Sequence, residues 1–378
     1  MAEQSNFDIC VIGAGIAGAS VAAELADKAR VLLVERESQP GYHTTGRSAA
    51  LFSTTYGPNV IRALSRASEI FHNDPPEGFD RPLLTPRGAL MIARDDQMES
   101  LEALQRELAG AAGVERLDGA AARALVPLLR GGHVAAAIFE HFAQDIDVHA
   151  LHQGYLRRFR TRGGTFVANA GVDAIGRGSG GWTIETGSNA FQATTIVNAA
   201  GAWGDVVAET AGIAPVGLVP KRRTAAMIAL PEGTNAHHWP MVIDIDEEFY
   251  AKPDAGRLLI SPADETPSEP CDAQPDEYDV AVAVDRVETA FDIQVRRIEN
   301  KWAGLRTFAA DKNPVVGWGD AGQSFFWLAG QGGYGIQTAP ALAKLAAALI
   351  LGKTPERAIM DHGIDLESMS PGRAMLRK

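Results

Sequence analysis

The sequence predicts an α/β fold made of two domains whose segments alternate along the chain. Three observations carry this prediction. A strand, an alanine-rich helix and a second strand follow one another near the N-terminus (FDICVIG, Ile16 to about Lys28, VLLVE), which is typical of a right-handed βαβ unit. Short strands with glycine-rich turns occupy residues 164–199. A glycine cluster then leads into an alanine-rich closing helix over 339–351.

The remaining elements follow from the same periodicity. Helices are expected near 59–72, 96–112 and 148–162, with Asp147 as the N-cap of the last one. Strands are expected at MVIDI, EFYAKP, RLLISP, KWAGLRTF, PVVGW and FFWLAG. The segment 262–280 is acidic and rich in proline, which is typical of a surface loop.

Composition excludes several classes of protein. The chain has 378 residues, of which 46% are apolar, and a net charge of −12, which argues against a nucleic-acid partner and against docking on an anionic membrane. The two cysteines, Cys10 and Cys271, give no disulfide framework and no CxxC metal pair. The N-terminus MAEQSNFD lacks the pattern of a signal peptide, and no run of about 20 apolar residues occurs. We therefore expect a soluble cytoplasmic protein without a transmembrane segment.

A dinucleotide fingerprint follows the first strand. In VIGAGIAGAS, Gly13 permits a tight turn, Gly15 lets the backbone approach a pyrophosphate, and Gly18 lets the helix pack on the strand. The helix N-terminus offers aligned N–H groups to the anion. Glu35 ends the second strand, where a carboxylate accepts both ribose hydroxyls and repels a 2′-phosphate, so NADP is disfavoured.

Two later segments favour a flavin over NAD. In TTIVNAAGAWGD (194–205) an apolar strand ends in small residues, as needed where the backbone passes close under a nucleotide. In AGQGGYGIQTAPALAKLAA (329–347) a glycine cluster opens a helix. A helix N-terminus aimed at the N1–C2=O edge of a flavin stabilises the negative charge that builds there on reduction. Each segment alone is equally an ordinary tight turn.

The motifs GAGIAG, YHTTGRSAA, DIDVHALHQGYLR, NAAGAWGD, PKRRTA, WAGLRTF and GQGGYGIQT together resemble the D-amino-acid oxidase/glycine oxidase (DAO) superfamily of FAD enzymes, and most of all its bacterial D-arginine dehydrogenases. The resemblance covers essentially the whole chain. It implies a Rossmann-type FAD-binding domain from residues 1–80, 147–215 and 305–378, in a glutathione-reductase-like fold. It also implies an antiparallel-sheet substrate domain from 81–146 and 216–304. The FAD is expected to be extended and non-covalent.

The same resemblance implies a reaction and assigns residues to it. An amine is oxidised by hydride transfer from Cα to flavin N5, and the imine hydrolyses to a 2-oxo acid and ammonia. The FAD contacts fall on Gly13, Gly15, Ala17, Gly18, Glu35, Arg36, Thr44, Thr45, Gly46, Arg47, Ser48, Ala49, Ala50, Leu51, Val172, Ala200, Gly201, Trp203, Gly332, Gly333, Tyr334, Gly335, Ile336, Gln337 and Thr338. The substrate contacts fall on Arg306, Arg223, Tyr250, Tyr56 and Gly333, and the pocket walls on Leu51, Ala89, Met241 and Ile243.

Arg306 is the central expectation. WAGLRTF places its guanidinium among tryptophan, leucine and phenylalanine, where a buried charge needs a partner or a ligand. An amino acid must present its Cα–H to the acceptor, and a guanidinium fork fixes its carboxylate by two parallel bonds. We therefore expect Arg306, assisted by Arg223, to hold that carboxylate. The alternatives are an internal ion pair for Arg306 and a solvated basic patch for Arg223, which follows Lys221 and Arg222.

Several other candidate site residues fit two interpretations. Tyr250 alternates with Phe249, so one of them faces inward. Tyr56 is either a lid residue or an ordinary aromatic, and Met241 and Ile243 fit a pocket wall and core packing equally well.

No catalytic histidine is assigned, because a neutral amine transfers hydride without a strong base at Cα. A metal at His141, Asp145, Asp147, His149 and His152 is disfavoured, since Asp147 is explained as a cap and the reaction needs no metal.

The sequence departs from D-arginine dehydrogenases at two places. Ala89 and Leu90 stand where their proline-arginine loop carries a glutamate, and Leu51 replaces a flavin-loop histidine. Since a buried cation would then lack a partner, we expect neutral or apolar D-amino acids to be preferred over D-Arg. The alternatives are a 2-hydroxy-acid dehydrogenase or an N-methyl or secondary amino-acid oxidase of the same superfamily, and a flavin-binding regulatory partner without turnover. The electron acceptor, a quinone or O2, is left open.

Overall fold

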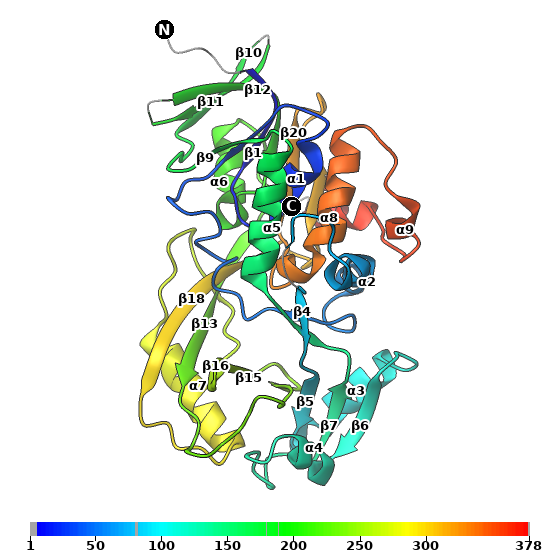
Figure 1. The fold of residues 1–378 in the computed structure, drawn as a ribbon, viewed down its shortest axis with the longest axis vertical. Coiled ribbons are helices and arrows are strands. Elements are labelled where there is room, and N and C mark those ends of the chain that lie inside the picture. The colour runs from blue at the N-terminus through cyan, green and yellow to red at the C-terminus, as the bar shows by residue number, and fades with distance from the viewer. Residues whose placement is uncertain (1–5, 80–81, 179, 188, 377–378) are drawn as a thin grey trace.

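The computed structural model describes residues 6–79, 82–178, 180–187 and 189–376. Residues 1–5, on which part of the signal-peptide prediction rests, lie outside this range, as do residues 80–81 at a predicted domain boundary. In the described residues the strands form two large sheets and one small sheet, with helices packed on both large sheets (Figure 1). None of the described helices is long and apolar enough to cross a bilayer.

The first large sheet is the predicted α/β unit. Its order is β10-β11-β12-β1-β2-β9, with β20 beside β12 and β19 beside β20. β1, β2, β9, β12 and β20 pair in parallel. The central residues of β1 and β2 are buried on both faces, which explains their continuous apolar runs. Its strands are β1 (Asn6–Ile12), β2 (Val31–Val34), β9 (Thr165–Val167), β10 (Ala174–Gly178), β11 (Gly181–Thr186), β12 (Asn189–Asn198), β19 (Val315–Trp318) and β20 (Phe325–Ala329).

Helices α1 (Ile16–Leu25), α5 (Val148–Thr161) and α8 (Gly335–Ile350) pack together against this sheet, and α2 (Asn59–Asn73) packs on α8. α1 is alanine-rich and buried over nearly its whole length because α5 and α8 both contact it. Asp147 caps α5 as expected, since its side chain accepts a hydrogen bond from the N–H of Ala150 at 2.8 Å. The short helices α6 (Gly204–Thr210) and α9 (Arg357–Met360) complete this half.

The second large sheet has the order β17-β13-β16-β15-β14-β5-β7-β6, with β18 beside β13. Its strands are β5 (Ala89–Ala93), β6 (Val114–Asp118), β7 (Ala136–Glu140), β13 (Val219–Ile228), β14 (Met241–Asp244), β15 (Tyr250–Asp254), β16 (Arg257–Ser261), β17 (Thr266–Pro267) and β18 (Ile298–Phe308). All pairings are antiparallel except that of β14 with β5. The small sheet joins β3 (Leu51–Phe52), β8 (Gln144–Ile146) and β4 (Leu84–Pro86).

Alternation along the second sheet separates two environments. On one face, the even-numbered residues of β13 and β16, such as Ala226 and Ile260, pack against the helix α7 (Glu277–Ala290). The helix α4 (Gly119–Leu125) packs on β6 and β7. The other face carries Ala225, Met241 and Tyr250. It points toward the first sheet, and α3 (Met98–Glu107) covers its far end. This inward face becomes one wall of the cavity described below.

Several elements, among them β5, β7, β13 and α4, were not expected from the sequence, and the helices α3, α7 and α8 also differ from it. α3 ends at Glu107 rather than near 112, and α8 begins at Gly335, inside the glycine cluster, rather than at 339. α7 was not expected: Val280, Ala283, Val287 and Ala290 form a buried stripe, and the Asp276 side chain accepts from the N–H of Tyr278. The acidic, proline-rich residues before it obscured its start. The division of the chain into two domains at the stated boundaries remains a prediction.

Candidate active site

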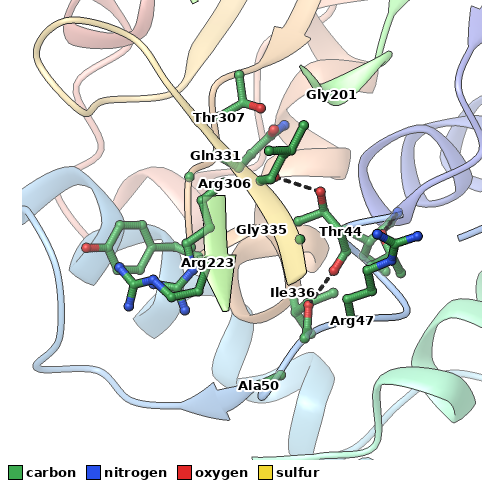
Figure 2. A pocket seen from close by; sticks show the side chains of 18 of the residues that line it. Thr44, Arg47, Ala50, Gly201, Arg223, Arg306, Thr307, Gln331, Gly335 and Ile336 are labelled. Atoms are coloured by element: carbon green, nitrogen blue, oxygen red, sulfur yellow. Dashed lines mark hydrogen bonds between the residues drawn. The ribbon is translucent and has the colours of Figure 1, made fainter. Parts of the chain in front are cut away.

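One elongated cavity of about 560 Å³ lies between the two large sheets. Its walls come from the turn after β1, the residues after β2, the loop 41–57, the end of β12, the inward face of the second sheet and the start of α8. Figure 2 looks into it and shows that Arg223 and Arg306 lie together, whereas Arg47 points away from them. Residues from distant parts of the sequence therefore meet at one site.

The glycine fingerprint forms one end of the cavity. Gly13 has φ +98°, and a Cβ there would lie 2.6 Å from the Ala199 carbonyl oxygen at the end of β12. A Cβ on Gly18 would lie 1.8 Å from the Gly13 carbonyl oxygen, so α1 can approach the turn only with glycine at this position. Ala199 also donates its N–H to Ile12. The small residues of NAAGAWGD thus pass close under this turn.

Glu35 lies directly beside the turn. Its side chain is 9% exposed, Oε2 accepts from the N–H of Ala14 at 2.8 Å, and Oε1 accepts from the N–H of Glu37 at 3.0 Å. β2 ends at Val34, so Glu35 is the first residue after the strand and not its last one. Held in this way, the carboxylate lines the cavity at the end opposite Arg306. Arg36 lies next to it, 5.2 Å from the centroid of the Trp203 ring.

The loop 44–50 is fixed by both sheets. Thr45 Oγ1 accepts from the N–H of Ile16 at 3.0 Å, at the first residue of α1. Thr44 Oγ1 donates to the Leu305 carbonyl at 2.7 Å. Arg47 donates through Nη1 to the Ala303 carbonyl at 2.9 Å, and through Nη2 to the Asp272 carboxylate at 2.5 Å. The loop therefore bridges α1 and β18 along the cavity wall.

The segment 262–280 corrects the expectation of a simple surface loop. Asp264 accepts from the N–H and hydroxyl of Thr224, and its carbonyl accepts from Arg223 Nε at 2.9 Å. Asp272 and the Ala273 carbonyl hold Arg47. In the sequence, the acidic residues of the segment 262–280 look like a solvated patch, but several of them are partners of arginines that line the cavity.

The start of α8 lies at the centre of the cavity. No side chain caps this helix, and the residues of its first turn, Gly335, Ile336 and Gln337, all line the cavity. Their N–H groups and the helix dipole make the part of the cavity beside the start of α8 favourable for a partial negative charge. A Cβ on Gly333 would lie 2.9 Å from Arg306 Nη1, so the guanidinium packs directly against the glycine backbone.

Arg306 has no hydrogen bond or ion pair to any of the described residues, so the alternative of an internal ion pair finds no support there. Burial alone would lower the pKa of its guanidinium. The phenols of Tyr250, Tyr56 and Tyr334 and the Glu247 carboxylate more than offset that effect, and the pKa is raised. Its positive charge is therefore secure and available to an anion in the cavity.

Arg223 is 8% exposed, so it does not belong to a solvated basic patch. It donates through Nε to the Asp264 carbonyl, and Nη2 lies 3.5 Å from Glu265. Burial and then the neighbouring Arg306 lower the pKa of this guanidinium, because both disfavour its charged form. Two cations that repel each other beside an open cavity are stabilised by an anion placed between them.

The strand register explains why the two arginines meet. β13 and β18 are antiparallel, Arg223 is opposite Gly304, and Arg306 is opposite Lys221. Arg223 and Arg306 are therefore diagonal neighbours on the same face of the sheet. Gly304 has no side chain to fill the space beside Arg223, and it lines the cavity too. Lys221 is held by Glu265 at 2.8 Å and is not free for a ligand.

Three phenols surround the pair. Tyr250 faces the cavity and its neighbour Phe249 packs in the core on the other face, which settles the alternation left open by the sequence. The Tyr56 ring lies 5.4 Å from the Tyr334 ring. Burial raises the pKa of Tyr56 and of Tyr334, so both hydroxyls remain protonated donors.

The apolar wall is where it was expected. Leu51, Ala89, Met241 and Ile243 all line the cavity. Alanine at position 89 does not leave the cavity without a carboxylate, however, because Glu140 and Glu247 also line it. Glu140 is buried at the end of β7, and Glu247 is exposed in the turn between β14 and β15. Strand periodicity places Glu140 on the inward face beside Ala89, whereas nothing in DIDEEF distinguishes Glu247 from its acidic neighbours.

Most predicted contact residues line the cavity, with three exceptions. Gly18, Gly46 and Thr338 do not reach its surface. Gly18 acts through helix packing, Gly46 closes the turn by donating its N–H to the Gly41 carbonyl, and the Thr338 hydroxyl donates to the Tyr334 carbonyl. Gln331, Thr307 and His43 line the cavity and were not predicted. The roles of individual residues toward ligands remain predictions.

The histidine-rich stretch 141–152 has structural roles. His152 Nε2 lies 2.9 Å from the Ala14 carbonyl, His141 pairs with Glu115, and Asp145 pairs with Arg87 and Lys252. Among the described residues no three His, Cys, Asp or Glu side chains are grouped as metal ligands.

The family model described as FAD dependent oxidoreductase (DAO) matches residues 8–349. The chain belongs to this family of FAD-dependent oxidoreductases. The cofactor is therefore FAD, and the geometry fits it, because Gly13 and Gly18 leave a cradle that a Cβ would fill. The turn after β1 would hold the pyrophosphate, Glu35 the ribose, and the start of α8 the flavin ring.

Curated relatives act on different substrates. L-2-hydroxyglutarate dehydrogenase of Escherichia coli (strain K12) is 27% identical over 55% of this chain, and the match spans about half (51%) of the relative's length. N-methyl-L-tryptophan oxidase of Salmonella agona (strain SL483) is 25% identical over 93% of this chain and 96% of its own. The structure of glycine oxidase from Geobacillus kaustophilus superposes with a TM-score of 0.82 at 22% identity and covers 98% of this chain and 99% of its own. The similarity to bacterial D-arginine dehydrogenases is not tested by these matches.

Proposed function

We propose that the chain oxidises an amino acid at the carbon that bears the amine, with Arg306 and Arg223 holding the substrate carboxylate. The observation that carries this proposal is Arg306 itself. Its guanidinium lies on the cavity against Gly333, without a partner among the described residues, and the neighbouring Arg223 adds a second positive charge. A carboxylate is the anion that a planar guanidinium binds best through two parallel bonds.

The proposed roles follow from the positions of the side chains. A substrate carboxylate bound by Arg306 lies beside the start of α8, which places the adjacent Cα over the region assigned to the flavin ring. Burial raises the pKa of Tyr56, so its hydroxyl stays a protonated donor to the same anion, and Tyr250 lines the cavity beside it. FAD, when bound, would supply the acceptor for the hydride that leaves Cα. The lone pair of the neutral amine forms the C=N bond of an iminium ion, which water hydrolyses to a 2-oxo acid and ammonium.

The proposed substrates are neutral or apolar D-amino acids. The wall beside the clamp is formed by Leu51, Ala89, Met241 and Ile243, which favour an apolar side chain. Glu140 already accepts two hydroxyl hydrogen bonds, and Glu247 is an exposed residue whose charge already acts on Arg306 and is weakened by water. The D configuration is proposed from the similarity to bacterial D-arginine dehydrogenases.

A second candidate is oxidation of a 2-hydroxy acid or of an N-methyl or secondary amino acid. It is favoured by the matches to an L-2-hydroxyglutarate dehydrogenase and an N-methyl-L-tryptophan oxidase. The same arginine pair would hold the carboxylate of either class, because the clamp contacts the part of the substrate that these compounds share.

Anaerobic reduction of the purified protein tests both candidates. The panel contains D- and L-leucine, methionine, phenylalanine and arginine, together with sarcosine, proline and 2-hydroxyglutarate, and the visible flavin absorbance is recorded. We expect D-leucine, D-methionine or D-phenylalanine to bleach it with a higher kcat/KM than D-arginine. Faster reduction by 2-hydroxyglutarate or an N-methyl amino acid would replace the proposal with the second candidate, and reduction by none would reject both. Admitting air then shows whether O2 reoxidises the flavin.

A further inference from the structure

Glu140 is a buried carboxylate that the proposed reaction does not use. It is the last residue of β7, is 3% exposed, and faces the cavity, whereas Phe139 faces the opposite core. Burying a carboxylate is costly unless its oxygens accept hydrogen bonds. Its partners therefore indicate why a charge is kept at this position.

Those partners belong to one tight turn, residues 53–56, which carries Tyr56. Glu140 Oε2 accepts from Ser53 Oγ and from Thr55 Oγ1, both at 2.7 Å. Ser53 Oγ in turn accepts from the N–H of Thr55 at 3.2 Å and of Tyr56 at 3.1 Å. A single carboxylate oxygen thus holds both hydroxyls and connects β7, through Ser53 Oγ, to the backbone N–H of Tyr56.

The turn is held on its other side by α8. The N–H of Ser53 donates to Gln337 Oε1 at 3.1 Å, in the first turn of that helix. The Tyr56 ring packs on Tyr334, and its hydroxyl is electrostatically close to Arg306 and Arg223. Fixing the turn therefore restricts where Tyr56 can lie in the cavity that Arg306 and Arg223 also line.

We propose that Glu140 is a positioning residue that holds Tyr56 in the cavity wall that it shares with Arg306, by tethering the turn 53–56 to β7. Glu140 does not touch the substrate in this account; it acts through Ser53 and Thr55. The inference rests on the proposed function only in assigning a carboxylate ligand to Arg306.

The electrostatics agree with a tether. Burial raises the pKa of Glu140, and the hydrogen bonds from Thr55 and Ser53 oppose that rise by stabilising the charged form. A backbone contact from Thr54 and the charge of Arg62 act in the same direction. The carboxylate is therefore stabilised mainly by the turn that it holds.

The first test is hydrogen exchange in the peptide that covers residues 51–58, measured on the holoenzyme. Glu140→Gln weakens both hydroxyl contacts, so we expect the amides of Thr55 and Tyr56 to exchange about tenfold faster. Glu115→Gln, on the neighbouring strand β6 with a side chain 51% exposed, is the matched control and should leave the peptide unchanged. Unchanged exchange in Glu140→Gln would overturn the proposal.

The second test is a double-mutant cycle with Tyr56→Phe, which distinguishes positioning from general stability. Affinity for benzoate, a plain carboxylate probe, is read from the flavin difference spectrum, and KM from the best substrate. Glu140→Gln and Tyr56→Phe should each weaken binding about tenfold, and the double variant should lose little more. Losses that multiply would overturn the proposal, as would a lower Tm with unchanged affinity.

The role of Glu140 can still be tested if Glu140→Gln does not fold or if the proposed function fails. Thr55→Val removes one donor and keeps the side-chain shape, so it should reproduce the faster exchange even if Glu140→Gln does not fold. If no panel compound reduces the wild-type protein, the proposed function fails, while hydrogen exchange still decides the role of Glu140.

Discussion

At the scale of single residues, the structure separates charges that stabilise the fold from charges that are free for a ligand. Arg47 and Arg223 have protein partners, and Arg306 has none among the described residues. The sequence WAGLRTF indicated this from its apolar neighbours alone. The exposed carboxylate of Glu247 gave no such signal, because it lies among other acidic residues in DIDEEF.

His72 provides a prediction at this scale. It is 1% exposed, Nε2 lies 3.0 Å from the Gln337 carbonyl, and Nδ1 is buried with no hydrogen-bond partner in the described part of the chain. Burial lowers the pKa of His72 to about 4, so the unfolded chain binds this proton near pH 6.5 and the folded chain does not. The stability that His72 contributes is complete above pH ~6.5 and is lost as the pH falls toward 4.

We therefore expect the free energy of unfolding of the wild-type protein to fall between pH 7 and pH 5 by about 2 kcal/mol more than that of His72→Phe. Urea unfolding followed by tryptophan fluorescence measures this difference. His149→Gln, at an exposed position of α5, is the control and should keep the wild-type pH dependence. Equal pH dependence in wild type and His72→Phe would contradict the assignment.

At the scale of elements, the cavity depends on where helices and strands begin and end. The βαβ unit, the strand β18 and most of the helices follow from periodicity and were predicted from the sequence. α7 and the true start of α8 were not, because tertiary contacts impose a helix where acidic residues, proline or glycine disfavour one locally. The pairing of β13 with β18, which brings the arginines together, is a register that no local pattern specifies.

The contact between α1 and the first turn gives a prediction at this scale. In Gly18→Ala the new Cβ would overlap the Gly13 carbonyl oxygen, so α1 must move away from the turn that is expected to hold the pyrophosphate. We expect the affinity for FAD to fall by about ten- to a hundredfold. Gly176→Ala, on strand β10 with no atom near the added methyl, is the matched control. FAD titration of the apoprotein by flavin fluorescence measures both, and equal affinities would exclude the packing role of Gly18.

At the scale of the whole molecule, the active site exists only when two sheets face each other. The first sheet supplies the FAD end through Gly13 and Glu35, and the second supplies Arg223, Arg306 and the apolar wall. The sequence predicted most of the residues that line the cavity, because glycine spacing and isolated charges are local signals, and their roles toward ligands stay predictions. It could not predict that Glu140 lines the cavity or that residues of the segment 262–273 hold Arg47 and Arg223, since those contacts depend on how the sheets pack. The configuration of the substrate, D or L, and the identity of the electron acceptor are likewise not encoded in any local motif.

The most direct test of the account removes only the carboxylate from the substrate. Anaerobic flavin reduction is compared for the best amino acid of the panel and for the amine that lacks only its carboxylate, for example D-leucine and isopentylamine. We predict that the wild-type protein reacts at least about a hundredfold faster with the amino acid, and that Arg306→Met removes this preference. Equal rates for the two compounds, or a preference that survives in Arg306→Met, would contradict the claim that Arg306 holds the substrate.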